Sequence, residues 1–207
     1  EVKALTDINL TFEKGEFTTL SGESGSGKTT LLNIIGGLDS ATSGEIFFEG
    51  EEITSYSEEK MAKLRLHDIG FIFQAYNLIH VLTVRENIGF IMKLLKFNEK
   101  EIDARVIELA SILQIEDLLD KLPGEISGGQ QQRVAVARAV ASRPKLILAD
   151  EPTANLDSKN SARLMNMLRA LNEKENVTVI FASHDKYVLE QSKRIVVLDD
   201  GVVIEDR

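Results

Sequence analysis

The feature that most constrains the fold is a glycine-rich loop, GESGSGKT, at residues 22–29. It matches the pattern G-x-x-x-x-G-K-[ST] and lies between a strand-like segment, GEFTTL (15–20), and a helical segment that ends near residue 38. Glycines in such a loop let backbone N–H groups wrap around a phosphate. The start of the following helix adds the positive end of its dipole. This order of strand, loop and helix predicts an α/β fold built around a phosphate site.

Two side chains of the loop have predicted roles. Lys28 would reach the β- and γ-phosphates of a nucleotide, and Thr29 would offer its hydroxyl to Mg²⁺. A flexible turn that matches the pattern by chance is the alternative, and the flanking strand and helix argue against it. The residues expected around the nucleotide are Gly22, Glu23, Ser24, Gly25, Ser26, Gly27, Lys28, Thr29 and Thr30.

The rest of the chain alternates between strand and helix at both ends. KLILADE (145–151) and VTVIFASHD (177–185) are nearly continuous apolar strands, which is typical of a parallel sheet covered on both faces. Another strand, HDIGFIFQ, is expected to end at Gln74. Hairpins are expected at 44–53 and 194–206, and helices at 98–115, 128–142 and 158–173. The sequence predicts a mostly parallel core with a helical insertion.

The helical middle of the chain carries a clear apolar face. Ile102, Val106, Leu109 and Leu113 follow one another at helical spacing, and Asn98 with Glu101 resembles a capping box. We expect one domain over 1–207, with a core at about 1–75 and 136–207 and a helical subdomain at about 76–135.

Polar residues follow three of the predicted strands. Asp150 ends a buried strand, where ligands bind in open α/β sheets, and could hold Mg²⁺ through water. Glu151 could polarise an attacking water as a general base. Alone, this acidic pair would more often be a solvated turn, but the loop at 22–29 reverses that preference. His184 could contact the γ-phosphate, and Gln74 could offer its carbonyl oxygen to Mg²⁺ or water.

Composition narrows the function classes. The net charge of −9 over 207 residues disfavours non-specific binding to nucleic acid or anionic lipid. The absence of cysteine excludes a disulfide scaffold and a Cys-ligated zinc site. No apolar run approaches the roughly 20 residues that span a bilayer. The chain opens at Glu1 within a strand or turn, so we expect the natural N-terminus to be missing.

A second glycine-containing helix start, ISGGQ at 126–130, raises the question of why one chain needs two. In chain order, GESGSGKT, ISGGQ, LILADE, NLD and SHD resemble the nucleotide-binding subunit of an ATP-binding cassette transporter, over essentially the whole chain. Ile126 replaces the leucine of the family's LSGGQ motif and keeps an apolar contact. The resemblance implies a P-loop NTPase core with a mostly parallel sheet, an antiparallel β subdomain and an inserted helical subdomain.

The resemblance also implies how the second motif works. Ser127, Gly128, Gly129 and Gln130 would cover the ATP held by a second copy, in a closed dimer around two ATP. Asp157 would be the key acid of a loop that crosses the interface, Gln74 would link the nucleotide to a membrane partner, and His184 would be the switch histidine. The implied cofactors are ATP and Mg²⁺, with Thr29, Gln74 and Asp150 near the metal.

The implied partners are a second copy and an integral membrane permease, not nucleic acid, which would place the chain at the cytoplasmic face of the membrane. Segments such as ADEPTANLDS are similar to the macrolide-export and lipoprotein-release branch. Three alternatives remain: an ATPase regulating cell-wall hydrolysis, a soluble cassette acting on nucleic acid or ribosomes, and a non-hydrolysing ATP sensor. Glu151 and His184 argue against the last.

Two features depart from the family or stay open. The family's adenine-stacking aromatic has no candidate here, since Phe12 and Phe17 are expected in strand core. The chain ends soon after the last hairpin, so we expect the family's short C-terminal helix to be absent too. The apolar run AYNLIHVL (75–82) could line a groove for a partner helix or could pack within the subdomain.

Overall fold

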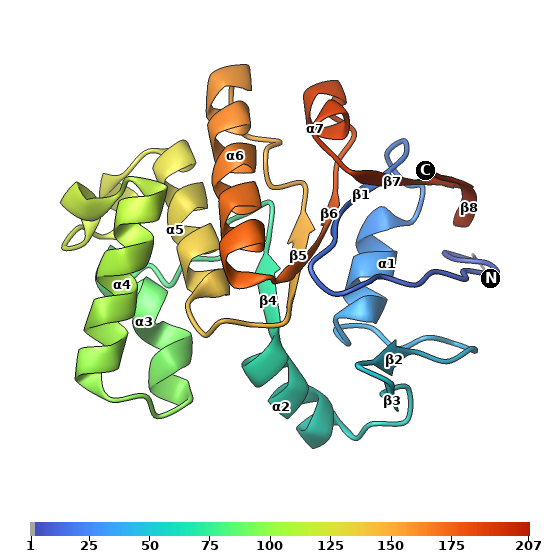
Figure 1. Ribbon diagram of the computed structural model, residues 1–207, viewed down its shortest axis with the longest axis horizontal. Helices are drawn as coiled ribbons and strands as arrows, with labels where there is room; N and C mark the ends of the chain where they lie inside the picture. The colour runs from blue at the N-terminus through green and yellow to red at the C-terminus, as the bar shows by residue number, and fades with distance from the viewer. Residues whose placement is uncertain (1–2) are drawn as a thin grey trace.

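A six-stranded sheet runs through the centre of the computed structural model, which describes residues 3–207 apart from the side chains of residues 186 and 187 (Figure 1). The strand order is β4-β5-β6-β1-β7-β8. All neighbouring strands are parallel except β7 and β8, which form an antiparallel hairpin. The strands are β1 (Phe17–Ser21), β4 (Ile69–Ile72), β5 (Leu146–Asp150), β6 (Thr178–Ala182), β7 (Arg194–Asp199) and β8 (Val202–Asp206).

The central strands are apolar throughout because both faces of the sheet are covered. In β5, Ile147 and Ala149 face one hydrophobic core, whereas Leu146 and Leu148 face another. This alternation follows from the two-residue period of a strand. A strand buried on both faces cannot show the polar alternation of an exposed sheet, which explains the run KLILAD.

Helices form the layers on either side. On one face α1 (Lys28–Ile35) packs against β5 and β6, and α2 (Glu58–Asp68) packs against β4. On the other face lie α5 (Gly128–Val140) and α6 (Ser158–Glu175), with α3 (Val84–Leu94) and α4 (Glu99–Leu113) packed beyond α5 (Figure 1). Shorter elements are α7 (Lys186–Glu190) and the 3₁₀ turns Glu116–Leu118 and Pro123–Glu125. Within residues 3–207 no helix is long and apolar enough to cross a bilayer.

The α4 helix bears out its predicted pattern. Ile102, Val106, Leu109 and Leu113 are all buried, and Asn98 and Glu101 form the expected capping box. These side chains share one hydrophobic core with α5, α6 and one face of the sheet. The boundary expected near residue 135 falls inside α5, so the division into core and helical subdomain stays a prediction.

Several local predictions need correction. Strands β4 and β6 end at Ile72 and Ala182, so Gln74 and His184 lie two residues beyond their strands rather than at the strand ends. Phe12 lies outside any strand; its half-buried ring packs against the core of the α1 face. The segment that forms α2 was not predicted as a helix. The expected hairpin is confirmed as β2 (Phe47–Phe48) and β3 (Glu51–Glu52), a separate antiparallel sheet, and the predicted α/β fold class is confirmed.

Candidate nucleotide site

The candidate site lies along the edge where the parallel strands end. Leu20 and Asp150 both pair with Ala182, so β1, β5 and β6 reach the same level before the chain turns off the sheet. The glycine loop follows β1, Glu151 follows β5, and His184 lies two residues beyond β6. Sheet order therefore brings segments more than a hundred residues apart in sequence to one edge, as ligand sites of open α/β sheets require.

The glycine loop has a backbone that only glycine accommodates at two key points. Gly22 and Gly27 have φ of 149° and 99°. A Cβ on Gly22 would lie 2.2 Å from the Leu198 carbonyl oxygen, and one on Gly27 would lie 2.9 Å from that of Ala4. Both the backbone conformation and the close neighbours thus exclude a side chain. The loop is held against β7 and the N-terminal segment, which fixes where its N–H groups point.

Lys28 is turned inward at the start of α1. Its Nζ donates to the carbonyl oxygens of Gly22 and Glu23 at 2.8 and 2.7 Å, and the residue is only 7% exposed. A buried ammonium needs such acceptors. The carbonyls of the loop thus hold the Lys28 ammonium inside the loop, within reach of a bound phosphate.

Thr29 and Asp150 meet across the sheet edge. The Thr29 hydroxyl lies 3.1 Å from both carboxylate oxygens of Asp150, to which it donates. This pairing presents a hydroxyl and a carboxylate side by side, which is a donor set that suits Mg²⁺ when phosphate oxygens complete its shell. The structure therefore brings together two of the three residues expected near the metal.

Glu151 and His184 form a second pair on neighbouring segments. His184 Nδ1 lies 2.8 Å from Glu151 Oε1, while the Glu151 backbone adopts a φ of 46°. The Glu151 side chain is 16% exposed and that of His184 is 70% exposed. The Glu151 carboxylate is thus mostly buried and oriented by its contact with His184, whereas the imidazole ring of His184 is exposed. This arrangement suits a base that orients a water.

Gln74 does not join this group in the structure. Its side chain is exposed, and its backbone carbonyl accepts from Asn155 Nδ2 at 3.2 Å. Arg138 of α5 donates to the carbonyls of Tyr76 and Asn77 in the same loop. The segment after β4 is therefore anchored through its backbone, which leaves the Gln74 amide unengaged by any described hydrogen bond.

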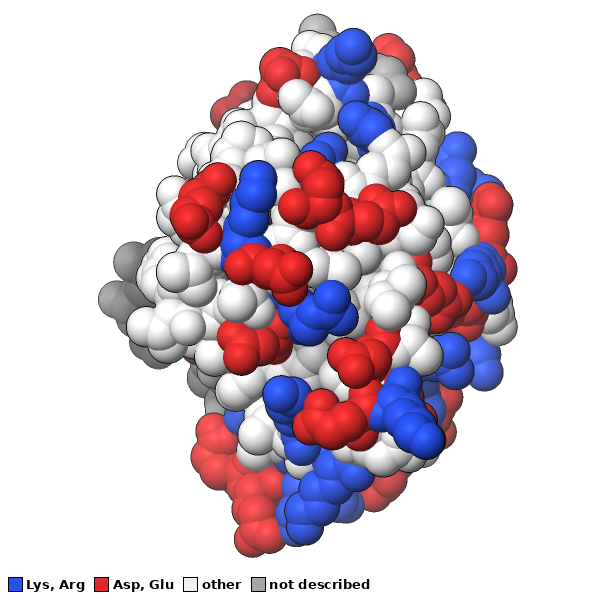
Figure 2. Space-filling view, turned by 90° about the vertical axis from the view of Figure 1, so that its left-hand side faces the viewer, with Lys and Arg blue, Asp and Glu red and all other residues white. Residues whose placement is uncertain are grey.

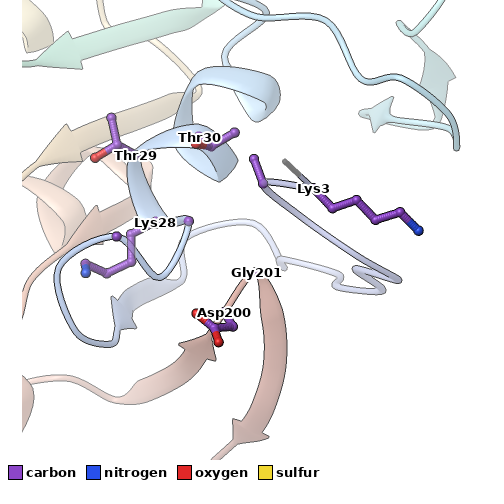
Figure 3. A pocket seen from close by; sticks show the side chains of 9 residues that line it. Lys3, Lys28, Thr29, Thr30, Asp200 and Gly201 are labelled. Carbon is purple, nitrogen blue, oxygen red and sulfur yellow. The ribbon is translucent and has the colours of Figure 1, made fainter. Parts of the chain in front are cut away.

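A cavity of about 370 Å³ adjoins the loop (Figure 3). Its lining consists of Lys3, Ala4, Gly25, Gly27, Lys28, Thr29, Thr30, Asp200 and Gly201. The Asp200–Gly201 turn was predicted as a hairpin turn but not as part of the site. Gly201 N donates to the Ser26 carbonyl at 3.1 Å, which ties the turn to the loop. Thr6 N donates to the Gly201 carbonyl at 2.8 Å, which ties the turn to the N-terminal segment as well. Such contacts between distant segments leave no pattern in the sequence.

The ISGGQ segment begins α5 and lies apart from the glycine loop (Figure 1). The Ser127 hydroxyl accepts from Gln130 N, and Ser127 N donates to Gln130 Oε1, so the pair forms a capping box. A Cβ on Gly128 would lie 3.0 Å from the Tyr76 hydroxyl. Among the described residues, no hydrogen bond joins this segment to residues 22–29. The N–H groups of Gly128 and Gly129, which the capping box does not use, lie away from this chain's own phosphate site.

Asp157 begins the next helix, α6. Its carboxylate accepts from Asn160 N at 2.9 Å and from Asn160 Nδ2 at 2.8 Å. The backbone hydrogen bond from Asn160 holds the pKa of the Asp157 carboxyl below its usual range. Asp157 is exposed and capping within this chain, so it does not reach the phosphate loop of its own chain.

Comparison with known proteins identifies the family. A family profile described as ABC transporter matches residues 5–154. The chain belongs to the ABC transporter family. It is 46% identical over 199 residues to the ABC transporter ATP-binding protein YvcR of Bacillus subtilis, covering 96% of this chain and 77% of that protein. It is 43% identical to the macrolide export ATP-binding/permease protein MacB of Campylobacter jejuni, covering 98% of this chain and 31% of that longer protein.

A solved structure agrees with these relatives. The dimeric structure of the ABC transporter cassette MJ0796 is 40% identical, has a TM-score of 0.92, and is matched over 100% of this chain and 90% of that one. The same cassette has been solved as a dimer in a post-hydrolysis state with ADP and Pi. The predicted family, the P-loop fold and the ATPase class are therefore confirmed.

The aromatic residues near the N-terminus have packing roles. Phe17 is 3% exposed and its ring centroid lies 5.0 Å from that of Phe181. The Arg194 guanidinium lies 5.2 Å from the centre of the Phe12 ring. Both rings thus have partners within the protein.

Proposed function

We propose that this chain binds ATP with Mg²⁺ at residues 22–30, hydrolyses it between two copies, and drives an integral membrane permease. The observation that carries the proposal is the Glu151–His184 pair, whose atoms lie 2.8 Å apart. His184 follows β6, the neighbour of β1, and β1 leads into the loop that contains Lys28. A phosphate loop alone would support binding. A sheltered carboxylate oriented by an imidazole beside that loop supports hydrolysis.

The residues divide the work between binding and reaction. Lys28 and the N–H groups of Gly22–Thr30 bind and orient the phosphates. Thr29 and Asp150, together with the Gln74 side chain turned toward them, would hold Mg²⁺, which would neutralise charge on the β- and γ-phosphates. Glu151 accepts a proton from the attacking water. His184 donates from Nδ1 to the Glu151 carboxylate and holds it in place, and a protonated His184 would also donate from Nε2 toward the γ-phosphate.

The second copy completes each site. The helix start at Ser127, Gly128, Gly129 and Gln130 is exposed at Ser127 and half-buried at the other three residues. Its N–H groups at Gly128 and Gly129 suit a phosphate, and no described hydrogen bond joins it to residues 22–29. A two-fold dimer would place it over the partner's ATP, with Asp157 at the interface. The dimers of the MJ0796 cassette support this arrangement.

The permease partner is proposed from relatives and from the surface. MacB carries ATP-binding and permease functions under one name, which favours an export-type permease partner and a place at the cytoplasmic face of a membrane. In the apolar segment at 75–82, Leu78 is buried in the core, whereas Val81 is 83% exposed and available to a partner. On the face formed by α3 and α4, Lys and Arg are interspersed with Asp and Glu rather than gathered as nucleic acid binding requires (Figure 2).

The test uses Glu151→Gln, which keeps the shape of the side chain but removes the base. This variant should bind ATP, lose turnover by at least about 100-fold, and persist as an ATP-bound dimer in size-exclusion chromatography. Glu173→Gln on the exposed end of α6 is the matched control and should behave as wild type. Normal turnover in Glu151→Gln would remove Glu151 from the reaction.

The same trapped dimer tests the permease. We would express Glu151→Gln in its native host, solubilise the membranes gently with ATP present, and identify what co-purifies. A multi-span permease supports the proposal. Recovery of ribosomes or of soluble proteins alone would overturn the transport role and favour the soluble-cassette alternative, while leaving the ATPase mechanism intact.

A further inference from the structure

Gln132 is a buried polar side chain that the proposed reaction does not use. It lies on α5, five residues after Ser127, and is 1% exposed. Its Nε2 donates to the Pro152 carbonyl oxygen at 2.8 Å. Its Oε1 is buried without a hydrogen-bond partner in the described part of the chain. A buried amide with one unpaired atom is costly, so an apolar residue would serve packing better here.

The acceptor of this bond lies directly after the proposed base. Glu151 has a φ of 46°, a region that a non-glycine residue keeps only when its surroundings hold it there. Glu151 N donates to the Ala182 carbonyl at 3.1 Å, and Ala154 N donates to the Glu151 carbonyl at 3.1 Å. Pro152 has no N–H, so its carbonyl is its only backbone hydrogen-bonding group. The Gln132 amide engages that group and anchors the turn to α5.

The start of α5 packs against the same loop. A Cβ on Gly129 would lie 3.4 Å from Leu156 Cδ2, and Leu156 N donates to the Thr153 carbonyl at 3.0 Å. The loop from Glu151 to Asp157 is thus joined to α5 at two points: near Leu156 by packing and at Pro152 by a hydrogen bond. These contacts are the links through which a displacement of the start of α5 would reach the Glu151 backbone.

We propose that Gln132 is a positioning residue that couples the two nucleotide sites of the dimer. Its hydrogen bond to the Pro152 carbonyl links α5 to the turn that contains Glu151. In the dimer α5 covers the partner's ATP, whereas Glu151 faces the ATP of its own chain, so a shift of α5 changes the position of Glu151. Hydrolysis in one site thereby depends on how well α5 has closed over the other. This inference rests on the proposed function.

The first variant is Gln132→Met, which preserves length and burial and removes the donor. The monomer should bind ATP within about twofold of wild type, while kcat falls about 10- to 100-fold because the base is misplaced. A chain that still contains Glu151 should then accumulate as an ATP-bound dimer, as Glu151→Gln does. Gln131→Met is the matched control: its neighbouring amide donates to the Ile126 carbonyl at 3.2 Å and should leave kcat within about twofold.

A second variant, Gln132→Asn, keeps an amide but is one methylene too short to reach Pro152, and it should show the same loss of kcat. If kcat, ATP affinity and the unfolding midpoint all fell together in both variants, Gln132 would have a packing role and the proposal would be overturned. Wild-type turnover in either variant would also overturn it. Glu151→Gln is run beside them: if it forms no ATP dimer, the proposed function fails; if it does while Gln132→Met turns over normally, only the coupling role fails.

Discussion

At the scale of single residues, Lys28 shows how the loop holds a positive charge where phosphate is proposed to bind. Its ammonium is bound by two loop carbonyls, so ATP exchanges one set of oxygen acceptors for a more negative one. Lys28→Ala should weaken ATP binding by at least about 100-fold, since charge-assisted hydrogen bonds contribute about 1.5–3 kcal/mol each. Titration calorimetry with ATP measures the change.

Lys3 provides a control for charge alone. It also lines the cavity, but its side chain extends away from the loop (Figure 3). Lys3→Ala should change ATP affinity by less than about threefold, because an exposed charge contributes about 0–1 kcal/mol. Equal losses in the two variants would mean that the cavity attracts ATP by its overall charge and that Lys28 has no special role.

Sequence reasoning succeeded at this scale where a motif fixes both the residue and its local backbone. The pattern at 22–29 named Lys28 and Thr29, and strand composition placed Asp150. No sequence pattern indicates that Lys28 turns inward to the loop carbonyls. None indicates that Gln132 donates to Pro152, the residue after Glu151. Such contacts depend on how the sheet edge and α5 come together, which is why the sequence alone did not indicate them.

At the scale of elements, one ionic cluster fastens α4 to the ends of α5 and α6. Arg105 is 4% exposed and donates to the Val140 and Ala141 carbonyls as well as to Glu108 and Glu175. Arg105→Leu should reduce the free energy of unfolding by about 3–5 kcal/mol, because Glu175 and the Ala141 carbonyl lose this partner while largely buried. Glu108 keeps its ion pair with Lys174. Urea denaturation at neutral pH measures the loss. A loss below about 1 kcal/mol would show that α4 is held by apolar packing alone.

The same cluster predicts how stability depends on pH. Hydrogen bonds from Lys174 and Arg105 lower the pKa of Glu108 from 4.5 to about 2. Because the folded pKa is the lower one, the stabilisation is complete above pH 4.5 and is lost as the pH falls toward 2. Glu108 is a third exposed, so solvent screening limits the contribution to about 1 kcal/mol. Glu108→Gln should flatten that part of the stability curve; an unchanged curve would contradict the assignment.

Element boundaries reveal where pattern reasoning fails. The α4 helix was predicted because its apolar face is buried at helical spacing. The α2 helix, EEKMAKLRLHD, has no buried residue and therefore no apolar stripe to recognise; its Ser57 cap and acidic first turn were the only signals. The strand expected over 67–74 was predicted past Ile72, where the apolar Phe73 follows the last ladder pair. The strand expected over 177–185 was predicted past Ala182, although the residues that follow there are polar. Hydrogen-bond pairing, not composition, ends a strand.

At the scale of the whole molecule, the separation of the glycine loop from the start of α5 implies that a working site needs two chains. Composition and periodicity could predict each motif, but only the resemblance to the cassette family implied that the two belong to different copies. The geometry agrees, since Ser127 caps its own helix at the surface and no described hydrogen bond links it to residues 22–29. A mixing experiment separates action within one chain from action between chains.

Lys28→Ala has a defective phosphate loop and an intact α5 start, whereas Ser127→Arg has the reverse. Each variant alone should lack ATP-driven dimerisation and turnover, although Ser127→Arg monomers should still bind ATP with near wild-type affinity. In a mixed dimer one site contains both defects, and the other combines the intact loop of one chain with the intact α5 start of the other.

In the mixed dimer the Arg side chain enters the site whose loop is defective and binds no ATP, so it does not block closure of the dimer. Mixing should therefore restore ATP hydrolysis that neither variant shows alone, measured as phosphate release against the ratio of the two chains. If the motifs acted within one chain, no ratio would restore activity, because neither chain would contain a complete site.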